Sequence, residues 1–439
     1  MLNDNNLFRE YLRYILPSIA SQVVFTTYVL VDGIFVARGV GENALAAVNI
    51  ASPYVTSLWA LSMIFAIGTS TVVARLKGEG NLRQASSVFT QNMTAMAIIS
   101  IIFALTVLMM TDKFCIWLGA TEQTHDYALT YIRTVAPFTA TFLFSYTLEI
   151  LMATDGHPFK ATMTVSLGVV INCILDYVFI FIFHQGVFGA AIATAISQSV
   201  VIVLYIIHFV SDKAEIRLCA VKWQRGQVLS CIIKGLPSGI SELSPGLITF
   251  IYVHQINKYF GSAELIGYSA TAYVAQILMI LAIGIAQGTQ PLLSFYNGAD
   301  RADKISKLLR YQIVTSLILE LLTVAILLKE SDKILSVFIT NDANLISNVE
   351  ILFKIFIISC VPAAFNIIIA SYFTSLEKPV PGTMISLGRC SYMLVLAICI
   401  MMAFNVSDWL WWAMSLGEVL TLVMAIILYL LHQQRIINK

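Results

Sequence analysis

Two aspartates lie inside apolar stretches that are long enough to cross a membrane. Asp32 lies near the end of the apolar run over residues 14–36. Asp176 lies within the run over residues 161–183. A carboxylate inside a bilayer costs at least ~2.5 kcal/mol even on the most lenient scale. We therefore treat both aspartates as candidates for binding a cation.

Further oxygen-bearing side chains accompany these aspartates. Asn172 precedes Asp176 by four residues, so both lie on one helical face. Thr194 comes about two turns into the next apolar run, and Tyr28 lies one turn before Asp32. Carboxylate, amide and hydroxyl oxygens suit a hard cation such as Na⁺, and the carboxylates also suit protons. If the two carboxylates face each other, at least one is expected to hold a proton unless a cation lies between them. The alternative is a buried hydrogen-bonded pair that only braces the helices.

The composition predicts a membrane protein that crosses the bilayer many times. Of its 439 residues 58% are hydrophobic and 12% are charged, and the mean hydropathy is +0.83. A soluble domain carries about 25% charged residues. Apolar runs of about 20 residues, the length of a membrane helix, recur along the chain. We predict twelve spans, at 14–36, 47–74, 88–110, 127–153, 161–184, 187–209, 235–257, 264–293, 310–328, 348–374, 383–404 and 409–431.

Lys and Arg are distributed unevenly between the two sets of alternate connections. One set holds most of them, and the other holds only Arg38, Lys113, Lys258, Lys329 and Lys333. Basic loops stay in the cytoplasm, so both termini are expected there. No cleaved signal peptide is expected at the N-terminus. Arg389, within a span, is expected to be a structural anchor near its inner end, and Glu320 and Glu418 are expected to make contacts between helices.

The chain is internally duplicated. Residue pairs 220 positions apart repeat, namely Pro17-Ser18 with Pro237-Ser238, Gly41 with Gly261, Gly68-Thr69 with Gly288-Thr289, Gly78 with Gly298, and Ser166-Leu167-Gly168 with Ser386-Leu387-Gly388. We therefore predict a six-helix lobe over residues 1–212, a cytoplasmic linker over 213–234 and a second six-helix lobe over 235–439. Because each half has an even number of spans, the repeats are parallel, as in transporters that bind substrate between two lobes. A duplicated channel is the alternative.

Several segments resemble one known family, the multidrug and toxic compound extrusion (MATE) transporters of prokaryotes. The matching segments are Tyr28 to Val48, with Asp32-Gly33 and Ala44-Leu45-Ala46-Ala47, then Gly68-Thr69 through Ala74-Arg75 to Gly78, Asn172 to Ile180, and Gly189 to Thr194. The resemblance implies an all-α, V-shaped fold of twelve transmembrane helices. It also implies a multidrug efflux antiporter that exports organic, often cationic and aromatic, compounds in exchange for protons or sodium ions.

The resemblance assigns the ion-coupling site to the N-terminal lobe. It implies that Asp32, Asn172, Asp176 and Thr194 bind H⁺ or Na⁺, and Tyr28 lies beside them. The duplication does not copy this set, because the positions 220 residues further on are Tyr252, Tyr392, Leu396 and Met414. The C-terminal lobe is therefore expected to lack an equivalent site.

A second group of residues is expected to bind the substrate. Glu149 matches a position where related transporters place a polar residue facing the cavity of the N-terminal lobe, and Ser145, Tyr146 and Gln198 are expected to line that cavity. Glu242 lies three residues before Pro245-Gly246, a pair expected to break or kink the seventh span. Glu149 has an alternative role, a bond to a neighbouring helix.

Other classes of function find little support in the sequence. HExxH, GxSxG and phosphate-binding glycine loops are missing, so neither an enzyme nor an ATP-driven pump is expected. The major-facilitator signature is missing from the loop after the second span. A flippase for lipid-linked or other amphipathic metabolites is the main alternative. We expect no cofactor besides the coupling ion, no nucleic-acid partner, and a monomer in the cytoplasmic membrane.

Overall fold

The computed structural model describes residues 4–220, 223–259, 262–338, 343–404 and 409–437, and this part of the chain is helical without strands. The helices are α1 (Asp4–Gly39), α2 (Glu42–Gly78), α3 (Leu82–Trp117), α4 (His125–Val135), η1 (Ala136–Phe138), α5 (Thr139–Thr154), α6 (Pro158–Asp176), η2 (Tyr177–Ile182), α7 (Gly186–Val210), α8 (Gln227–Tyr259), α9 (Ser262–Gly298), α10 (Ala302–Lys329), α11 (Ser331–Phe338), α12 (Ala343–Ile358), α13 (Cys360–Ser375), α14 (Pro379–Cys390), α15 (Tyr392–Ala403) and α16 (Trp409–Ile437).

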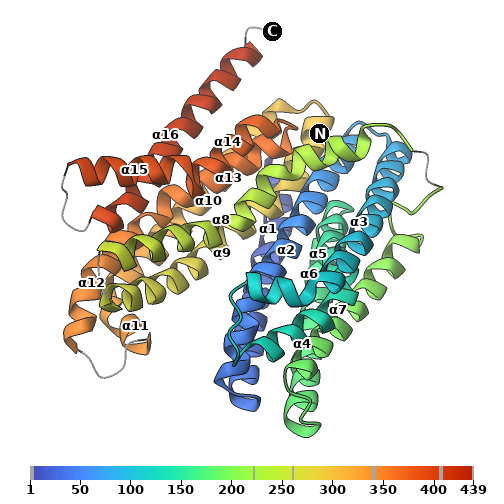
Figure 1. The fold of residues 1–439 in the computed structure, drawn as a ribbon. Coiled ribbons are helices and arrows are strands. Elements are labelled where there is room, and N and C mark those ends of the chain that lie inside the picture. The colour runs from blue at the N-terminus through green and yellow to red at the C-terminus, as the bar shows by residue number, and fades with distance from the viewer. Residues whose placement is uncertain (1–3, 221–222, 260–261, 339–342, 405–408, 438–439) are drawn as a thin grey trace.

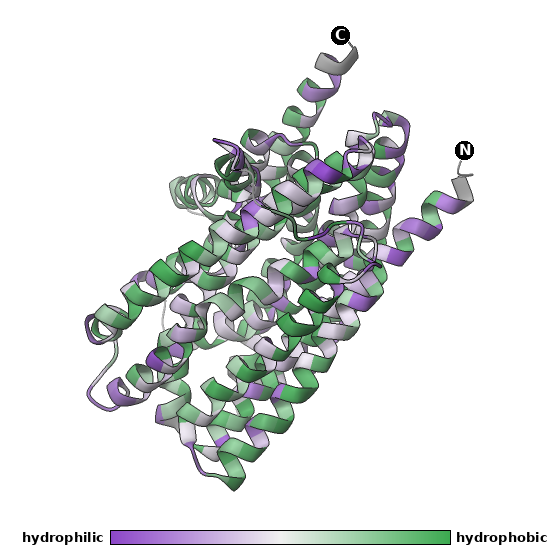
Figure 2. Cartoon of the chain, turned by 90° about the vertical axis from the view of Figure 1, so that its right-hand side faces the viewer, coloured by the Kyte–Doolittle hydropathy of each residue, from purple (hydrophilic) through white to green (hydrophobic). Residues whose placement is uncertain are grey.

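The protein is a multi-pass membrane protein. Within the described residues, eleven helical stretches are long and apolar enough to span a bilayer. The remaining predicted span, 235–257, corresponds to α8, which has 33 residues but contains Lys234, Glu242 and two prolines. Several of the spans are built from two consecutive helices, such as α12 and α13. Figure 2 shows apolar residues along the middle of the bundle and hydrophilic residues gathered in the loops and at its two ends.

The helix breaks do not all fall where the sequence predicts them. The span formed by α14 and α15 is interrupted at Ser391, where φ is −137° and ψ is −94°. In contrast, α8 stays helical through Pro245-Gly246, so this pair does not break the helix. A proline removes one backbone hydrogen bond, and α8 is held by packing against α2, α13 and α14 along its length.

The helices form two lobes that together make a V (Figure 1). The N-terminal lobe contains α1 to α7, and the C-terminal lobe contains α8 to α16. The connection covers residues 211–226, because α8 begins at Gln227 rather than at the predicted residue 235. The start of α1, the end of α16 and the start of α8 lie at the end where the lobes meet, which we call the closed side. The lobes diverge towards the other end, which we call the open side.

Glycines allow the lobes to touch backbone to backbone at the closed side. A Cβ atom added at Gly78 of α2 would lie 2.0 Å from the carbonyl oxygen of Phe295 on α9. A Cβ atom added at Gly298 of α9 would lie 1.9 Å from the carbonyl oxygen of Arg75 on α2. The two contacts repeat each other with the 220-residue offset of the sequence repeat. The duplicated glycines therefore form a symmetric helix crossing between the lobes.

Ion pairs and hydrogen bonds reinforce this contact. Arg75 of α2 bonds through Nε to Oε1 of Glu377 at 2.9 Å, and Lys234 of α8 approaches the same carboxylate at 3.1 Å. Glu377 follows α13, so the first of these pairs joins the two lobes. Nearby, the hydroxyl of Ser70 donates to Oε1 of Gln290 on α9 at 2.8 Å. The closed side is therefore held by polar contacts as well as by backbone packing.

We predict that a Gly78→Ala substitution destabilises the closed side. The new methyl group has to displace the backbone of α9, and such overpacking costs about 1–3 kcal/mol. The thermal unfolding midpoint of the purified protein in detergent is expected to fall. Gly246→Ala is the matched control, because a Cβ atom at this helical position meets nothing within 4 Å. Equal midpoints for the two variants would contradict the close crossing.

Candidate cation and substrate sites

The carboxyl groups of Asp32 and Asp176 face each other within hydrogen-bonding reach. Asp32 comes from α1, and Asp176 is the last residue of α6 and is 0% exposed. On each side chain the Oδ1 atom has no hydrogen-bond partner among the described residues. Two carboxylates at this range repel strongly in a poorly solvated site. The pair is thus suited to hold a shared proton or a bound cation.

Asn172 connects Asp176 to the neighbouring helix α7. With its amide nitrogen towards Asp176, Asn172 donates to Oδ2 at 2.9 Å. In the same orientation its amide oxygen accepts from the hydroxyl and the backbone N–H of Thr194, both at 3.3 Å. The hydroxyl of Tyr28 lies 3.4 Å from Oγ1 of Thr194. The structure therefore brings the five residues of the predicted ion site together.

The backbone changes form directly after Asp176. Residues Tyr177–Ile182 form a π-helix, in which each turn contains more residues than in an α-helix. Short π segments inside membrane helices rotate the side chains that follow them, and they are frequent at functional sites. The segment ends at Phe183, shortly before α7 begins at Gly186. The π-helix therefore determines which way the side chains that follow Asp176 point relative to the carboxyl pair.

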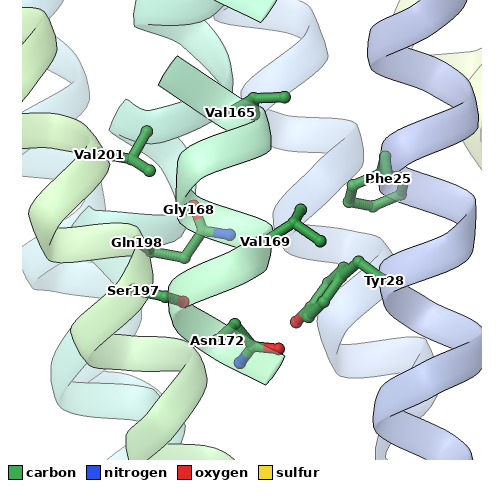
Figure 3. A pocket seen from close by; sticks show the side chains of 9 residues that line it. All are labelled: Phe25, Tyr28, Val165, Gly168, Val169, Asn172, Ser197, Gln198 and Val201. Atoms are coloured by element: carbon green, nitrogen blue, oxygen red, sulfur yellow. The ribbon is translucent and has the colours of Figure 1, made fainter. Parts of the chain in front are cut away.

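A small pocket adjoins the carboxyl pair on its closed-side flank (Figure 3). It lies between α1, α6 and α7, and Figure 3 shows the hydroxyl of Tyr28 pointing across it towards α6. Its lining residues are Phe25, Tyr28, Val165, Gly168, Val169, Asn172, Ser197, Gln198 and Val201. Because Tyr28 and Asn172 belong to both places, the pocket is continuous with the ion site.

Tyr131 is a neighbour of the site that sequence reasoning missed. This residue lies on α4, and its ring hydroxyl interacts electrostatically with both Asp32 and Asp176. It is one of 18 tyrosines in the chain, and its distance from the other site residues along the sequence gives no signal. Only the packing of α4 against α2 and α7 places it beside the carboxyl pair.

A second polar network crosses between the lobes. The hydroxyl of Ser21 on α1 donates to Oε1 of Glu149 on α5. Next to it, Gln22 of α1 donates to Oε1 of Gln287 on α9 at 2.8 Å. Gln287 in turn donates to the hydroxyl of Tyr146 on α5 at 3.1 Å. The network therefore joins α1 and α5 of one lobe to α9 of the other.

Glu149 and Glu242 both lie near this network. Each interacts electrostatically with the hydroxyl of Tyr146, and the two acids come from opposite lobes. An aromatic row continues from Tyr146, whose ring centroid is 5.6 Å from that of Trp59. Trp59 packs against Phe25 at 5.1 Å between centroids. Two acids and a row of aromatic rings thus lie near the interface of the lobes.

Three residues that were expected to line one cavity lie in different places in the structure. Ser145 is buried, and its hydroxyl donates to the carbonyl oxygen of Phe142 in its own helix at 3.2 Å. Gln198 lies in the pocket beside Asn172, whereas Tyr146 belongs to the network between the lobes. The helical positions are close in depth, but the rotation of α5 and α7 directs the side chains to different places.

A third group, Asp155, His157 and His208, lies at the closed side with the arrangement of a metal site. Nζ of Lys160 is 3.2 Å from Nδ1 of His208, and an ammonium group can only donate. His208 therefore carries its proton on Nε2 and donates it to Oδ2 of Asp155 at 2.8 Å. Because this nitrogen has no free lone pair, the group acts as a hydrogen-bonded network.

Arg389 is the anchor of a buried ion pair rather than a residue at the membrane surface. Its Nη2 atom is 3.1 Å from Oε1 of Glu418, and its side chain is only 9% exposed. Asn366 donates to Oε2 of Glu418 at 2.7 Å. The sequence predicts Arg389 as a structural anchor and Glu418 in a contact between helices, and the ion pair between α14 and α16 agrees with both expectations.

Comparison with known proteins gives consistent matches over almost the whole chain. A family model described as MatE matches residues 17–178 and again residues 237–400. The multidrug export protein MepA of Staphylococcus saprophyticus is 20% identical over 440 residues, which cover 99% of this chain and 96% of that protein.

Solved structures share the fold at similar levels of identity. A multidrug resistance MATE family transporter of the MOP superfamily, solved in an outward-facing conformation, matches with a TM-score of 0.88 and 22% identity, covering 98% of this chain and 96% of that one. The Vibrio cholerae MATE transporter VcmN matches with a TM-score of 0.89 and 19% identity, covering 99% of this chain and 98% of that one.

Proposed function

The chain belongs to the MatE family, whose members are secondary transporters rather than enzymes, and we propose that it is a multidrug efflux antiporter. It exports organic, cationic aromatic compounds across the cytoplasmic membrane and takes up H⁺ or Na⁺ in exchange. The observation that carries this proposal is the pair of Asp32 and the buried Asp176, whose facing carboxyl groups leave one oxygen each without a partner in the described chain.

The sidedness follows from the basic residues. The closed side carries Arg75, Lys77, Lys160 and Lys234 among the described residues. Cytoplasmic surfaces of membrane proteins are enriched in Lys and Arg, so the closed side faces the cytoplasm. The V then opens to the outside. In this conformation an external cation can reach the carboxyl pair while the cytoplasmic route is shut.

The region between the lobes supplies the chemistry for a flat cationic substrate. Glu149 and Glu242 provide negative charge, and the rings of Tyr146 and Trp59 provide faces that attract cations. Acidic groups at this interface are a poor match for the pyrophosphate of a lipid-linked sugar. A drug-exporting function is therefore favoured over the flippase alternative.

Helix α1 provides a physical connection between the ion site and the proposed substrate site. Tyr28 and Asp32 of α1 belong to the ion site. On the same helix, about two turns from Tyr28 and three turns from Asp32, Ser21 and Gln22 bond to Glu149 and Gln287. Neutralising the carboxyl pair changes the forces on α1 and thereby its bonds to the network between the lobes. Cation binding and drug binding are then coupled, each weakening the other.

Transport in liposomes tests the function. Purified protein is reconstituted, and ethidium movement is followed by fluorescence under an imposed pH gradient and then under a Na⁺ gradient. In at least one condition, we expect ethidium to move in the direction opposite to that in which the cation flows down its gradient. Ethidium movement of the same rate without any gradient would indicate a channel or carrier, and no movement in any condition would contradict drug antiport.

We predict that Glu149→Gln weakens the binding of ethidium by about tenfold or more, which corresponds to ~1.4 kcal/mol. The substitution removes a negative charge from the site between the lobes but keeps the acceptor for Ser21. Binding is measured by fluorescence anisotropy in detergent. A neutral compound with a similar ring system serves as the matched ligand and should bind equally well to both forms. Unchanged ethidium affinity would exclude Glu149 from the substrate site.

A further inference from the structure

The C-terminal lobe contains a stripe of buried polar side chains that the proposed function does not use. Gln312, Ser316 and Glu320 lie on one face of α10 at intervals of four residues. Their exposed fractions are 0%, 0% and 1%. Along the lobe they lie between two apolar clusters, one containing Leu308 and the other containing Val324. The stripe is thus a polar layer inside the lobe.

The polar atoms of this layer lack partners. Both amide atoms of Gln312, the hydroxyl of Ser316 and both carboxylate oxygens of Glu320 have no hydrogen bond among the described residues. More than nine in ten buried polar groups in proteins have a partner. Each buried polar group without a partner lowers the stability of the fold. Three such side chains in one stripe therefore indicate that the lobe binds a ligand there.

The charge balance of the surrounding helices identifies the ligand. Arg389 and Glu418 neutralise each other in their ion pair. On α13, Cys360 is the titratable group that interacts with Glu320, and it also lies within electrostatic range of Arg389 and Glu418. This leaves Glu320 as the acid that needs neutralising.

The other helices packed against α10 do not supply that charge. On α12, Glu350 and Lys354 pair with each other at 2.7 Å. On α9, Tyr268 is stacked on Tyr252 with 5.0 Å between ring centroids. On α11, Lys333 pairs with Glu330 at the open-side surface. On α1, Tyr11 packs against Tyr311 of α10 with 5.7 Å between ring centroids. No described basic group thus compensates Glu320.

We propose that Glu320 is the centre of a second site for a small monovalent cation, H⁺ or Na⁺, inside the C-terminal lobe. Ser316 lies one turn before Glu320 on the same face of α10, the direction in which helical side chains lean. Carboxylate and hydroxyl oxygens are ligands of hard cations, and Gln312 extends the polar path one turn towards the closed side. The site is not a copy of the N-terminal one, which is formed by α1, α6 and α7.

The internal repeat shows that this site is particular to the C-terminal lobe. The positions 220 residues before Gln312, Ser316 and Glu320 are Asn92, Met96 and Ser100 on α3. Ser100 bonds to the carbonyl oxygen of Ala97 at 2.8 Å, and Asn92 donates to that of Val88 at 2.9 Å. The acid therefore occurs in one lobe only, as the aspartate pair occurs in the other.

The test uses a full-length background in which Asp32→Asn and Asp176→Asn remove the N-terminal carboxyl pair. Thermal unfolding midpoints are measured while Na⁺ is raised at alkaline pH, and separately while the pH is lowered in potassium salts. We expect the midpoint to rise in at least one series, because a ligand that binds only the folded state stabilises it. A response to Na⁺ identifies sodium as the ligand, and a response to pH alone identifies the proton.

Adding Glu320→Gln to this background should remove the response and hold the midpoint near the cation-saturated value. Glu320→Asp keeps the carboxyl group and should keep a response, shifted in concentration. Infrared difference spectra provide a second readout, in which the carboxylic acid band formed at low pH should lose one component in Glu320→Gln. Identical midpoint responses and identical spectra with and without Glu320→Gln would overturn the proposal. Because the assay requires no transport, such a failure would leave the proposed drug export untouched.

Discussion

Asp176→Asn is expected to lower cation-driven ethidium export by about 5- to 150-fold, the range that corresponds to a typical coupling free energy of 1–3 kcal/mol. The substitution keeps the volume of the side chain but removes the charge that a cation neutralises. Asp176 is 0% exposed and lies within reach of Asp32, so the variant leaves a single carboxyl group at the site. The measurement is the initial rate of ethidium export in liposomes under a fixed gradient.

The matched control for this variant is Asp126→Asn. The side chain of Asp126 is 97% exposed at the open-side end of α4, so its charge is solvated and does not contribute to a buried site. We expect its export rate to equal that of the unmodified protein. Full gradient-driven export by Asp176→Asn, with normal insertion in the membrane, would mean that the pair only braces α1 against α6.

Arg389→Met is expected to destabilise the C-terminal lobe by about 3–5 kcal/mol, because it leaves the charge of Glu418 buried without its partner. Nε of Arg389 lies 3.2 Å from both carboxylate oxygens of Glu418, which is 1% exposed. The free energy of unfolding is read from thermal or denaturant titration of the purified protein in detergent.

The double variant Arg389→Met with Glu418→Gln should recover most of this loss. The amide of Gln can keep a hydrogen bond with Asn366, which lies 2.7 Å from Oε2 of Glu418, and no uncompensated charge remains. If Arg389→Met alone were as stable as the unmodified protein, the ion pair would have no structural role. If the double variant were no better than the single one, lost packing rather than charge would explain the effect.

The ion site could be predicted from the sequence because short-range rules identify its members. The four-residue spacing of Asn172 and Asp176 places both on one face of α6 whatever surrounds that helix. The cost of a carboxyl group inside a membrane singles out Asp32 and Asp176 before any contact is known. The resemblance to a known family then adds Thr194 on α7. These signals depend on composition and helical period, which single sequences carry well.

Contacts that depend on how helices rotate and tilt could not be predicted in this way. Tyr131 reaches the carboxyl pair only through the packing of α4, and Ser21 meets Glu149 across two helices. The partner of Arg389 is likewise set by the approach of α14 to α16. Gln198 and Tyr146 were expected to line one cavity. Their helices direct them to different places.

The coupling between cation and drug is measured most directly as the affinity of the purified protein for ethidium at increasing Na⁺ and at decreasing pH. We expect the dissociation constant to rise by about 5- to 150-fold as the carboxyl pair is neutralised. In the Asp32→Asn and Asp176→Asn double variant, the remaining cation dependence should be much smaller. An ethidium affinity that is independent of both cations in the unmodified protein would contradict coupling through the Asp32 and Asp176 pair.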